Sequence, residues 1–328
     1  MSEKSSELKN VYLPKGFKLQ RYTIQEKAKP GGFGIVYLAR REDGLSVAIK
    51  EFLPASLRCR TAADNGRVSF DNADDARKFK DGLNSFFQEA DTVAKIRDPQ
   101  IIEILDVFEA NGTAYFVMPY ERGCSLHDYI KYRGGRIADA EIRDLFIYAC
   151  SGLQVLHEHD LLHLDIKPGN LWVRPDNSLI LLDLGASRNK YNYHLFGPSA
   201  RTPGYAAPEQ HSSLNKTANV PLTVKTDTYG IATSMYACIE GSAPPAANLR
   251  VKESIPLSIM RRGQSSSELL KLIDRGMSLD VKGRIPSAEE FKSLLLGLPR
   301  LKYECDFYNL KVSNDAPKLP PIESIIGK

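Results

Sequence analysis

The chain lacks the sequence features of membrane proteins, of disulfide-rich secreted proteins and of nucleic-acid-binding proteins. No apolar run approaches the ~20 residues that a membrane-spanning helix requires, and the first five residues are polar, unlike the apolar core of a signal peptide. The 5 cysteines are odd in number and scattered, without the spacing of metal ligands. The net charge is only +4, which is too small to indicate binding to nucleic acid. We therefore expect a cytoplasmic protein with reduced thiols, no membrane segment and no nucleic-acid partner.

Two short polar segments carry most of the chemistry that the sequence contains. One loop carries Asp165, Lys167 and Asn170, and a short apolar strand expected after it ends at Asp183. The Asp165 carboxylate can accept the proton of an attacking hydroxyl, and the Lys167 ammonium can neutralise a phosphate. The side-chain oxygens of Asn170 and Asp183 are ligands that Mg²⁺ prefers. Either segment alone is a common polar turn, but together they favour phosphoryl transfer.

In this order and spacing, the two segments resemble the catalytic and metal-binding loops of the protein kinases. The resemblance implies ATP as the phosphate donor and Mg²⁺ as its metal, with Mn²⁺ as the alternative. It assigns Asp165 to positioning and deprotonating the acceptor hydroxyl, and Lys167 to stabilising the transferred phosphoryl group. It assigns Asn170 and Asp183 to holding the metal. In this family, a lysine two positions after the catalytic aspartate favours serine and threonine as acceptors.

An upstream glycine-rich segment matches the loop that covers the phosphates of ATP in this family. Without Cβ atoms, glycines let backbone N–H groups approach phosphate oxygens closely. In the strand expected shortly after this loop, side-chain alternation places Ala48 and Lys50 on one face. A small residue can then flank the base while the lysine ammonium reaches the phosphates. The nucleotide-binding residues expected in this region are Gly31, Gly32, Gly34, Val36, Ala48 and Lys50.

Lys50 needs a carboxylate partner because its long side chain does not place its charge unaided. The resemblance assigns this role to Glu89, which lies beside an apolar stripe of helical spacing that runs from Phe86 to Val93. The separation of Lys50 and Glu89 is longer than the family needs, which indicates an insertion over residues 51–81. The start of this insertion looks like that of a subgroup of bacterial serine/threonine kinases.

A strand that runs into a linker resembles the hinge between the two kinase lobes. Met118 stands at the gatekeeper position of this segment. Pro119 has no N–H group, but adenine needs only the carbonyl of that residue and the amide of Glu121. Trp172 occupies the position that lies under adenine in the family. Packing in the core is an equally good interpretation for this residue, the only tryptophan of the chain.

Three further charged residues are assigned structural roles by the resemblance. Glu209 is expected to form an ion pair with Arg284 that closes the large lobe. Asp227 is expected at the start of a buried helix, where its carboxylate accepts backbone N–H groups of the catalytic loop. Residues 202–209 resemble the end of the activation segment of this family. Leu164 replaces the arginine that in related kinases contacts a phosphate on that segment, so we expect control without that contact.

The order of the motifs predicts an α+β protein of the bilobal protein kinase fold. The small lobe is strand-rich with one helix, and the large lobe is mainly helical. We expect a leader over residues 1–21, the kinase domain over residues 22–298 and a C-terminal tail over residues 299–328, which is either an extended strap or mobile. Within the domain, the boundaries are about 22–118 for the small lobe, about 118–122 for the hinge and about 122–298 for the large lobe.

These features together predict a serine/threonine protein kinase that transfers the γ-phosphate of ATP to protein hydroxyls. One alternative is a pseudokinase or nucleotide-binding scaffold, although such proteins usually lack Lys50, Asp165 or Asp183. Another is a small-molecule kinase, although those enzymes generally lack a segment like residues 205–209. The expected partners are protein substrates with serine or threonine acceptors, together with a regulator that contacts the 51–81 insertion or the tail. Delivery of the protein into another cell is an alternative to action in the cytoplasm of its own cell.

Overall fold

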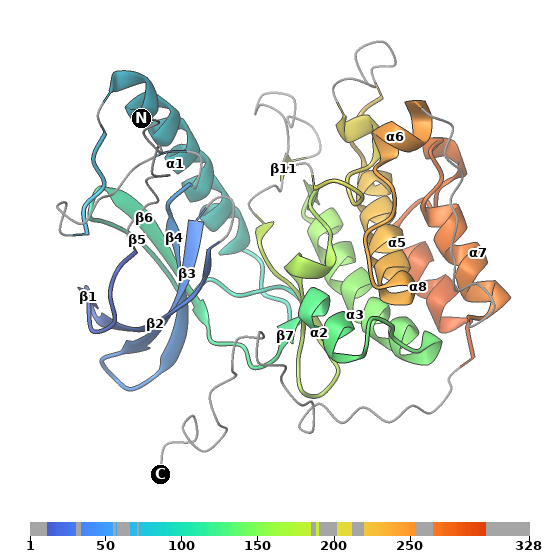
Figure 1. The fold of residues 1–328 in the computed structure, drawn as a ribbon, viewed down its shortest axis with the longest axis horizontal. Helices are drawn as coiled ribbons and strands as arrows, with labels where there is room; N and C mark the ends of the chain where they lie inside the picture. Colours follow the sequence, from blue (N-terminus) through green and yellow to red (C-terminus); the bar gives the residue numbers. More distant parts are fainter. Residues whose placement is uncertain are drawn as a thin grey trace, which may run out of the picture. The chain divides into compact units, whose positions relative to one another are not determined.

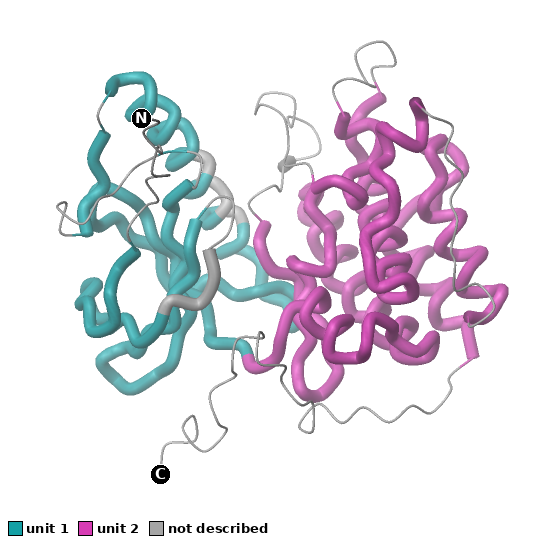
Figure 2. The backbone as a smooth tube through the Cα atoms, viewed as in Figure 1, with its two compact units in different colours: residues 1–121 teal, residues 122–328 magenta. Residues whose placement is uncertain are grey.

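The structure is a computed structural model in which the chain forms two compact units, residues 1–121 and 122–328 (Figure 2). The described residues are 12–30, 34–54, 57, 66–70, 72–184, 188–189, 202–211, 220–252 and 265–299. Within these ranges, only the backbone is described for residues 27–30, 85, 88, 89, 92, 188 and 189.

Unit 1 contains an antiparallel sheet of six strands in the order β1-β2-β3-β4-β6-β5. Strands that follow one another along the chain pair with each other, except β4 and β5. The long helix α1 lies between these two strands in the sequence, and β4 pairs with β6 instead (Figure 1). The strands are β1 (Lys18–Leu19), β2 (Tyr22–Pro30), β3 (Gly34–Arg41), β4 (Ser46–Phe52), β5 (Asp106–Ala110) and β6 (Thr113–Pro119), and the helix is α1 (Ala73–Val93).

The register of this sheet brings four of the predicted nucleotide-binding residues to one face. Lys50 pairs with Val36 of β3 and with Phe116 of β6, and Ala48 pairs with Met118. Directly paired residues direct their side chains to the same side of a sheet, and residues two apart on a strand share that side. The alternation that we used to place Ala48 and Lys50 together is therefore confirmed.

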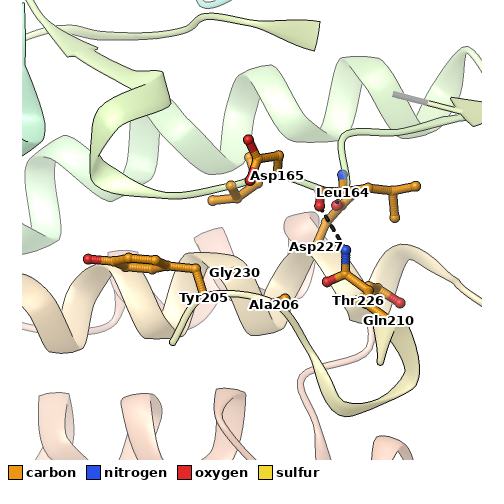
Figure 3. A pocket seen from close by; sticks show the side chains of 9 residues that line it. Leu164, Asp165, Tyr205, Ala206, Gln210, Thr226, Asp227 and Gly230 are labelled. Atoms are coloured by element: carbon orange, nitrogen blue, oxygen red, sulfur yellow. Dashed lines mark hydrogen bonds between the residues drawn. The ribbon is translucent and has the colours of Figure 1, made fainter. Parts of the chain in front are cut away.

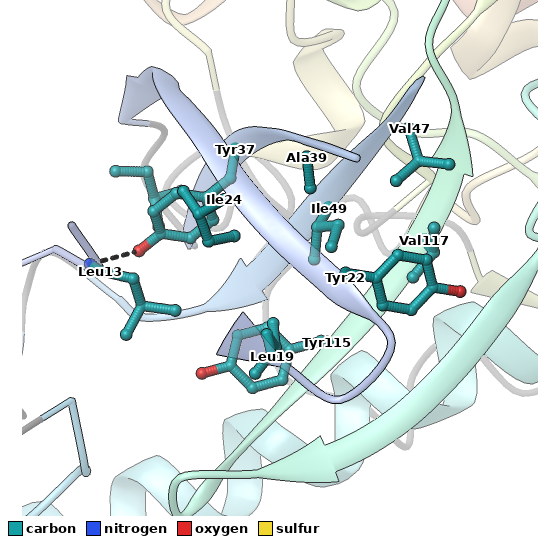
Figure 4. Close-up of a cluster of buried hydrophobic side chains, with 11 residues drawn as sticks. Leu13, Leu19, Tyr22, Ile24, Tyr37, Ala39, Val47, Ile49, Tyr115 and Val117 are labelled. Atoms are coloured by element: carbon teal, nitrogen blue, oxygen red, sulfur yellow. Dashed lines mark hydrogen bonds between the residues drawn. The ribbon is translucent and has the colours of Figure 1, made fainter. Parts of the chain in front are cut away.

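The opposite face of the sheet carries a buried apolar cluster that extends into the first described residues of the chain (Figure 4). Leu13 and Leu19 are only 3% and 2% exposed, and β1 pairs with β2. The Leu13 N–H group also donates a hydrogen bond to the Tyr37 hydroxyl over 3.2 Å. Residues that we assigned to the leader thus form part of the core of unit 1.

Helix α1 is longer than its apolar stripe predicted, because it begins within the expected insertion. Asn72 caps its start by accepting a hydrogen bond from the Asp75 N–H group over 2.8 Å. Phe79 packs its ring on Phe52 at the end of β4, with the ring centroids 5.0 Å apart. The 51–81 segment is therefore not a separate insertion throughout, because β4 contains its first two residues and α1 its last nine (73–81).

Unit 2 is mainly helical, as predicted, and its helices surround the buried helix α5. Helix α5 packs against α3, α7 and α8. The helices are α2 (Leu126–Tyr132), α3 (Asp139–Glu158), α5 (Val224–Glu240), α6 (Ala247–Lys252), α7 (Ser267–Gly276) and α8 (Ala288–Leu296). Short strands form two small sheets: β10 (Leu179–Leu181), β9 (Leu171–Val173) and β7 (Cys124–Ser125) in one, and β11 (Arg188–Asn189) with β8 (Leu161–Leu162) in the other.

The expectations for membranes and thiols can be compared with the described part of the chain. No helix in this part is long and apolar enough to cross a membrane. Cys124, Cys150 and Cys238 are buried, whereas Cys59 and Cys305 lie outside the described residues.

Candidate active site

The loop between β8 and β9 gathers the predicted catalytic residues of unit 2 around the carboxylate of Asp165. Lys167 Nζ lies 2.6 Å from Asp165 Oδ2 and donates a hydrogen bond to Thr202 Oγ1 over 2.9 Å. The Thr202 hydroxyl in turn donates to Asp165 Oδ1 over 2.9 Å. The Asn170 side-chain amide donates to Asp165 Oδ2 and to the Asp165 backbone carbonyl, each over 2.9 Å. Both carboxylate oxygens are thus held by donors, which fixes the orientation of the carboxylate.

Thr202 is a member of this cluster that we did not predict from the sequence. It begins the segment 202–209, which we interpreted as the end of the activation segment, and it lies 37 residues from Asp165 along the chain. Sequence spacing cannot show that a hydroxyl this far away returns to the catalytic loop. The signal available was its place at the start of a recognised segment.

The backbone around Asp165 is held in an unfavourable conformation by buried side chains. Leu164 has φ 63°, a left-handed value that is costly for a residue with a bulky side chain. The Asp227 carboxylate accepts the N–H groups of His163 (2.9 Å) and Leu164 (2.7 Å), as predicted. The Gln210 side chain donates to the Leu164 carbonyl over 2.8 Å. These contacts hold the backbone groups of Leu164 and so offset the strain of the turn.

A small pocket lies beside Asp165 and is shown in Figure 3. The dashed line in that figure is the hydrogen bond from Gln210 to Leu164. Tyr205 borders the pocket, and burial raises the pKa of its phenol to about 12. The phenol therefore stays neutral over a wider pH range than that of an exposed tyrosine. The pocket is lined by Leu164, Asp165, Ile166, Tyr205, Ala206, Gln210, Thr226, Asp227 and Gly230.

The two predicted metal ligands lie at the same end of the paired strands β9 and β10. Asn170 precedes β9, and Asp183 follows β10. The Leu182 N–H group donates to the backbone carbonyl of Asn170 over 2.8 Å, so Asp183 lies one residue beyond that contact. Asp183 has φ 54°, a left-handed value that aspartate tolerates better than most residues. The side-chain nitrogen of Asn170 already donates to Asp165, so its side-chain oxygen is the atom that would bind a metal. One carboxylate and one amide oxygen suit Mg²⁺, which keeps several waters and phosphate oxygens as ligands.

No group of three or more His, Cys, Asp or Glu side chains within the described ranges could hold a metal ion. A metal bound by Asn170 and Asp183 would therefore need most of its ligands from a nucleotide and from water. That donor set is typical of Mg²⁺ sites that act on nucleoside phosphates.

Trp172 is fixed by contacts within unit 2. Its indole N–H donates to the backbone carbonyl of Arg122 over 3.2 Å, and it pairs with Ser125 across the small sheet. Gly123 makes this contact feasible, because a Cβ atom there would lie 2.0 Å from the Val173 carbonyl oxygen and 2.9 Å from the indole nitrogen. Its φ of 131° also favours glycine. The indole is only partly buried, so it is not a fully enclosed core residue.

In unit 1, Lys50 is 9% exposed and its ammonium lies over two aromatic rings. Its Nζ is 5.0 Å from the ring centroid of Phe116 and 5.9 Å from that of Phe86. The two rings stack on each other with centroids 4.6 Å apart. Cation–π attraction of this kind stabilises an ammonium that burial has removed from water.

Gly34 has a structural requirement in addition to the role expected from the glycine-rich loop. A Cβ atom at this position would lie 2.1 Å from the carbonyl oxygen of Glu51 on the neighbouring strand. Only glycine permits β3 and β4 to approach so closely.

The remaining predicted nucleotide-binding residues are placed only in part. Met118 and Pro119 end strand β6, and Glu121 is the last residue of unit 1. Gly31 and Gly32 lie outside the described residues. Glu89 lies on α1, but its side chain is not among those described, so the pairing with Lys50 stays a prediction.

The predicted ion pair of Glu209 and Arg284 is confirmed. Two parallel hydrogen bonds of 2.6 and 2.8 Å join the guanidinium to the carboxylate, and both side chains are almost fully buried. The Thr226 hydroxyl donates to the same carboxylate over 2.8 Å, and the guanidinium lies 4.9 Å from the Tyr229 ring centroid.

Leu164, which stands where related kinases have an arginine, is 3% exposed and packs in a buried apolar cluster with Leu162.

The fold and this loop define a class of protein with a strand-rich unit and a helical unit, in which the second carries a hydrogen-bonded cluster of Asp165, Lys167, Asn170 and Thr202. The protein kinase domain family matches residues 22–294, and the chain belongs to this family. Both the resemblance found in the sequence and the predicted fold class are thereby confirmed.

A solved structure described as "PpkA-294 apo form" aligns with a TM-score of 0.74 and 30% sequence identity. The alignment covers 87% of this chain and 99% of that one. The chain is 25% identical to the probable serine/threonine-protein kinase zyg-1 of Caenorhabditis briggsae, over 84% of this chain and 34% of that protein. It is 26% identical to the probable serine/threonine-protein kinase PknB of Lactococcus lactis, over 68% of this chain and 35% of that protein. The chain thus spans about a third of the length of these curated relatives.

Proposed function

We propose that the protein is an active serine/threonine protein kinase that transfers the γ-phosphate of ATP to protein hydroxyls. The observation that carries the proposal is the hydrogen-bonded cluster of Asp165, Lys167, Asn170 and Thr202. It contains an oriented carboxylate, an adjacent ammonium and the side-chain amide of a predicted metal ligand in one loop. The serine/threonine kinases among the relatives support the choice of acceptor.

Asp165 receives the proton of the acceptor hydroxyl as the oxygen of that hydroxyl bonds to phosphorus and the bond from the γ-phosphorus to ADP breaks. Thr202 and Asn170 keep the carboxylate in one orientation during this step. The Lys167 ammonium, one of its partners, stabilises the negative charge of the transferred phosphoryl oxygens. Preorganisation of these groups avoids the cost of ordering them during the reaction.

Asn170 and Asp183 would hold Mg²⁺, with Mn²⁺ as the alternative, and the metal supplies charge neutralisation for the phosphates of ATP. For the nucleotide itself we propose Gly31, Gly32, Gly34, Val36, Ala48, Met118, Pro119, Glu121 and Trp172. Lys50, paired with Glu89, would bind the α- and β-phosphates. The shared face of Val36, Ala48, Lys50 and Met118 supports this set.

For the domain limits, we propose a kinase domain over residues 22–298 with a hinge at about residues 118–122. The division of the chain between residues 121 and 122 supports the position of the hinge. We also propose that a regulatory partner contacts the 51–81 segment or the 299–328 tail.

The test is to incubate the purified full chain with γ-labelled ATP, Mg²⁺ and candidate proteins, and to map the modified residues. We expect phosphoserine and phosphothreonine, and no transfer by the Asp183→Asn variant, because an amide lacks the charge that holds the metal. ATP binding without transfer by the wild-type protein would indicate a pseudokinase instead. Transfer to a small molecule but to no protein would indicate a small-molecule kinase.

A further inference from the structure

Glu51 is a fully buried carboxylate beside the predicted phosphate-binding lysine. It directly follows Lys50 on β4 and is 0% exposed. Successive residues of a strand point to opposite faces of the sheet, so the Glu51 side chain lies on the face away from the Lys50 ammonium. Burying a carboxylate is costly unless hydrogen bonds compensate for the lost water. The residue therefore needs an explanation, and the proposed chemistry does not use it.

Two tyrosines on the neighbouring strands compensate for this burial. Tyr37 of β3 donates its hydroxyl proton to Glu51 Oε2 over 2.7 Å, and Tyr115 of β6 donates to Oε1 over 2.5 Å. Each tyrosine hydroxyl also accepts a hydrogen bond over 3.2 Å, from the Leu13 N–H group and from the Asn111 side chain respectively. The carboxylate thus joins strand β4 to both of its neighbours, and the network reaches the first described residues of the chain.

This junction lies at the end of the pairing between β4 and β6. The pairing of β4 with β6 ends at Glu51 and Tyr115, one residue beyond Lys50. Past this point, the Thr113 hydroxyl holds the Phe52 carbonyl over 2.6 Å. On the other side, β3 approaches Glu51 so closely that Gly34 has no space for a Cβ atom. The end of a ladder frays most easily, and fraying here would displace the lysine backbone.

We propose that Glu51 is a positioning residue that fixes Lys50 for nucleotide binding, and this inference rests on the proposed kinase function. The two tyrosine hydroxyls reach the carboxylate only when β3, β4 and β6 are in the observed register. A shift of β4 by one residue would turn Glu51 toward the opposite face and leave both hydroxyls without it. A buried polar group that loses its partners costs free energy, so the network penalises displacement of the strand that carries Lys50.

The main test uses the double variant Tyr37→Phe/Tyr115→Phe, which keeps both rings and removes both donors to Glu51. The matched control is Val47→Ala, a fully buried apolar residue on the same strand and the same face. We expect at least a 10-fold loss of kcat/KM for ATP in the double variant, mostly as a raised KM. We expect little change in the control, even where urea unfolding shows the same loss of stability. Equal kinetics in the two variants at equal stability would overturn the proposal.

A second measurement does not depend on kinase activity. The rate at which an amine-reactive reagent acylates Lys50, mapped by mass spectrometry under native conditions, reports the position and exposure of the ammonium. We expect this rate to change at least 3-fold in the double variant and to stay near the wild-type value in Val47→Ala. The labelling rate in Glu51→Gln, which retains a hydrogen-bonding oxygen, should lie closer to the wild-type rate than that in Glu51→Leu does.

If the wild-type protein proves inactive but the labelling rates follow this order, the kinase proposal fails and the positioning role stands. Unchanged labelling in all variants would overturn the positioning role itself.

Discussion

At the scale of single residues, the Asp165 carboxylate shows how a group can be held in one orientation and still accept a further hydrogen bond. Lys167, Asn170 and Thr202 occupy positions around its two oxygens, and each carboxylate oxygen has more than one lone pair. The cluster therefore leaves acceptor capacity for a substrate hydroxyl while it prevents rotation of the side chain. Such a residue contributes orientation as well as basicity.

Asp165→Asn should lower kcat about 10²- to 10⁴-fold, because the amide cannot accept the hydroxyl proton. Nucleotide binding should change little, and the fluorescence of Trp172, the only tryptophan and a proposed nucleotide contact, should report it. Asp176→Asn is a suitable control, since Asp176 is an exposed turn residue of the same unit and asparagine suits turns. Wild-type turnover in Asp165→Asn would refute the assignment of the base.

The contact of Lys50 with the aromatic rings predicts a measurable coupling. In a double-mutant cycle of Lys50→Met and Phe116→Leu, urea unfolding should show a coupling energy of about 0.5–2 kcal/mol, because the ammonium lies 5.0 Å from the ring centroid. The control cycle replaces Phe116→Leu by Phe108→Leu, whose ring belongs to the cluster on the opposite face. Additivity within about 0.3–0.5 kcal/mol in both cycles would show that the ring contact carries no energy.

At this scale, the sequence could predict residues whose roles follow from local spacing. Asp165, Lys167 and Asn170 lie within one short loop, and the alternation of a strand was enough to place Ala48 with Lys50. Thr202 and Phe116 were not predicted, because their contacts depend on how distant segments return to the loop and to the sheet. Glu51 was counted only as the start of an insertion. Its burial depends on Tyr37 and Tyr115, which alternation alone could not select as partners.

At the scale of elements, the apolar stripe from Phe86 to Val93 predicted a helix but not its true start. The residues before it are mixed in polarity, so periodicity gave no boundary, and the cap at Asn72 was the signal that we did not use. Phe79 explains the extension, because its burial against Phe52 stabilises the first turns of α1. A pattern that seemed to be an insertion was therefore partly the continuation of an expected element.

The Glu209–Arg284 pair joins a segment near the catalytic loop to the residues that precede α8. Arg284→Met should destabilise the protein by about 3–5 kcal/mol, because it leaves Glu209 as an uncompensated buried charge. The double variant Glu209→Leu/Arg284→Met should recover part of that loss in urea unfolding. Arg275→Met is the matched control. Its pair with Glu290 is also an Arg–Glu pair, but the side chains are 45% and 40% exposed, so we expect about 0–1 kcal/mol. Similar losses in both single variants would contradict the buried-charge argument.

At the scale of the whole molecule, the order of motifs along the chain predicted a strand-rich part followed by a helical part. The structure has that order because each motif lies on a particular element. Lys50 lies on β4, Asp165 in the loop between β8 and β9, and Asp227 on α5. What the sequence could not predict is how far the first unit extends toward the chain start. Leu13 and Leu19 carry no motif, and their burial becomes visible only when the sheet is assembled.

Unit 2 buries titratable groups whose neutral forms are favoured there, and this burial predicts how the stability of the protein changes at alkaline pH. Burial raises the pKa of Tyr205 from 10.0 to about 12 and raises that of the Cys238 thiol above 9.0. In the unfolded chain both groups lose their protons at lower pH than in the folded state, so rising pH favours unfolding. The stability that Tyr205 contributes is fully present below pH 10 and is lost as the pH rises to about 12.

Urea unfolding between pH 8 and 12 should therefore show a free energy of unfolding that falls from about pH 9. Tyr205→Phe should make this fall shallower above pH 10, whereas Tyr148→Phe, at an exposed position of the same unit, should leave it unchanged. An identical pH dependence in wild type and Tyr205→Phe would show that the Tyr205 phenol titrates alike in the folded and unfolded chains, and the proposed effect of its burial would be wrong.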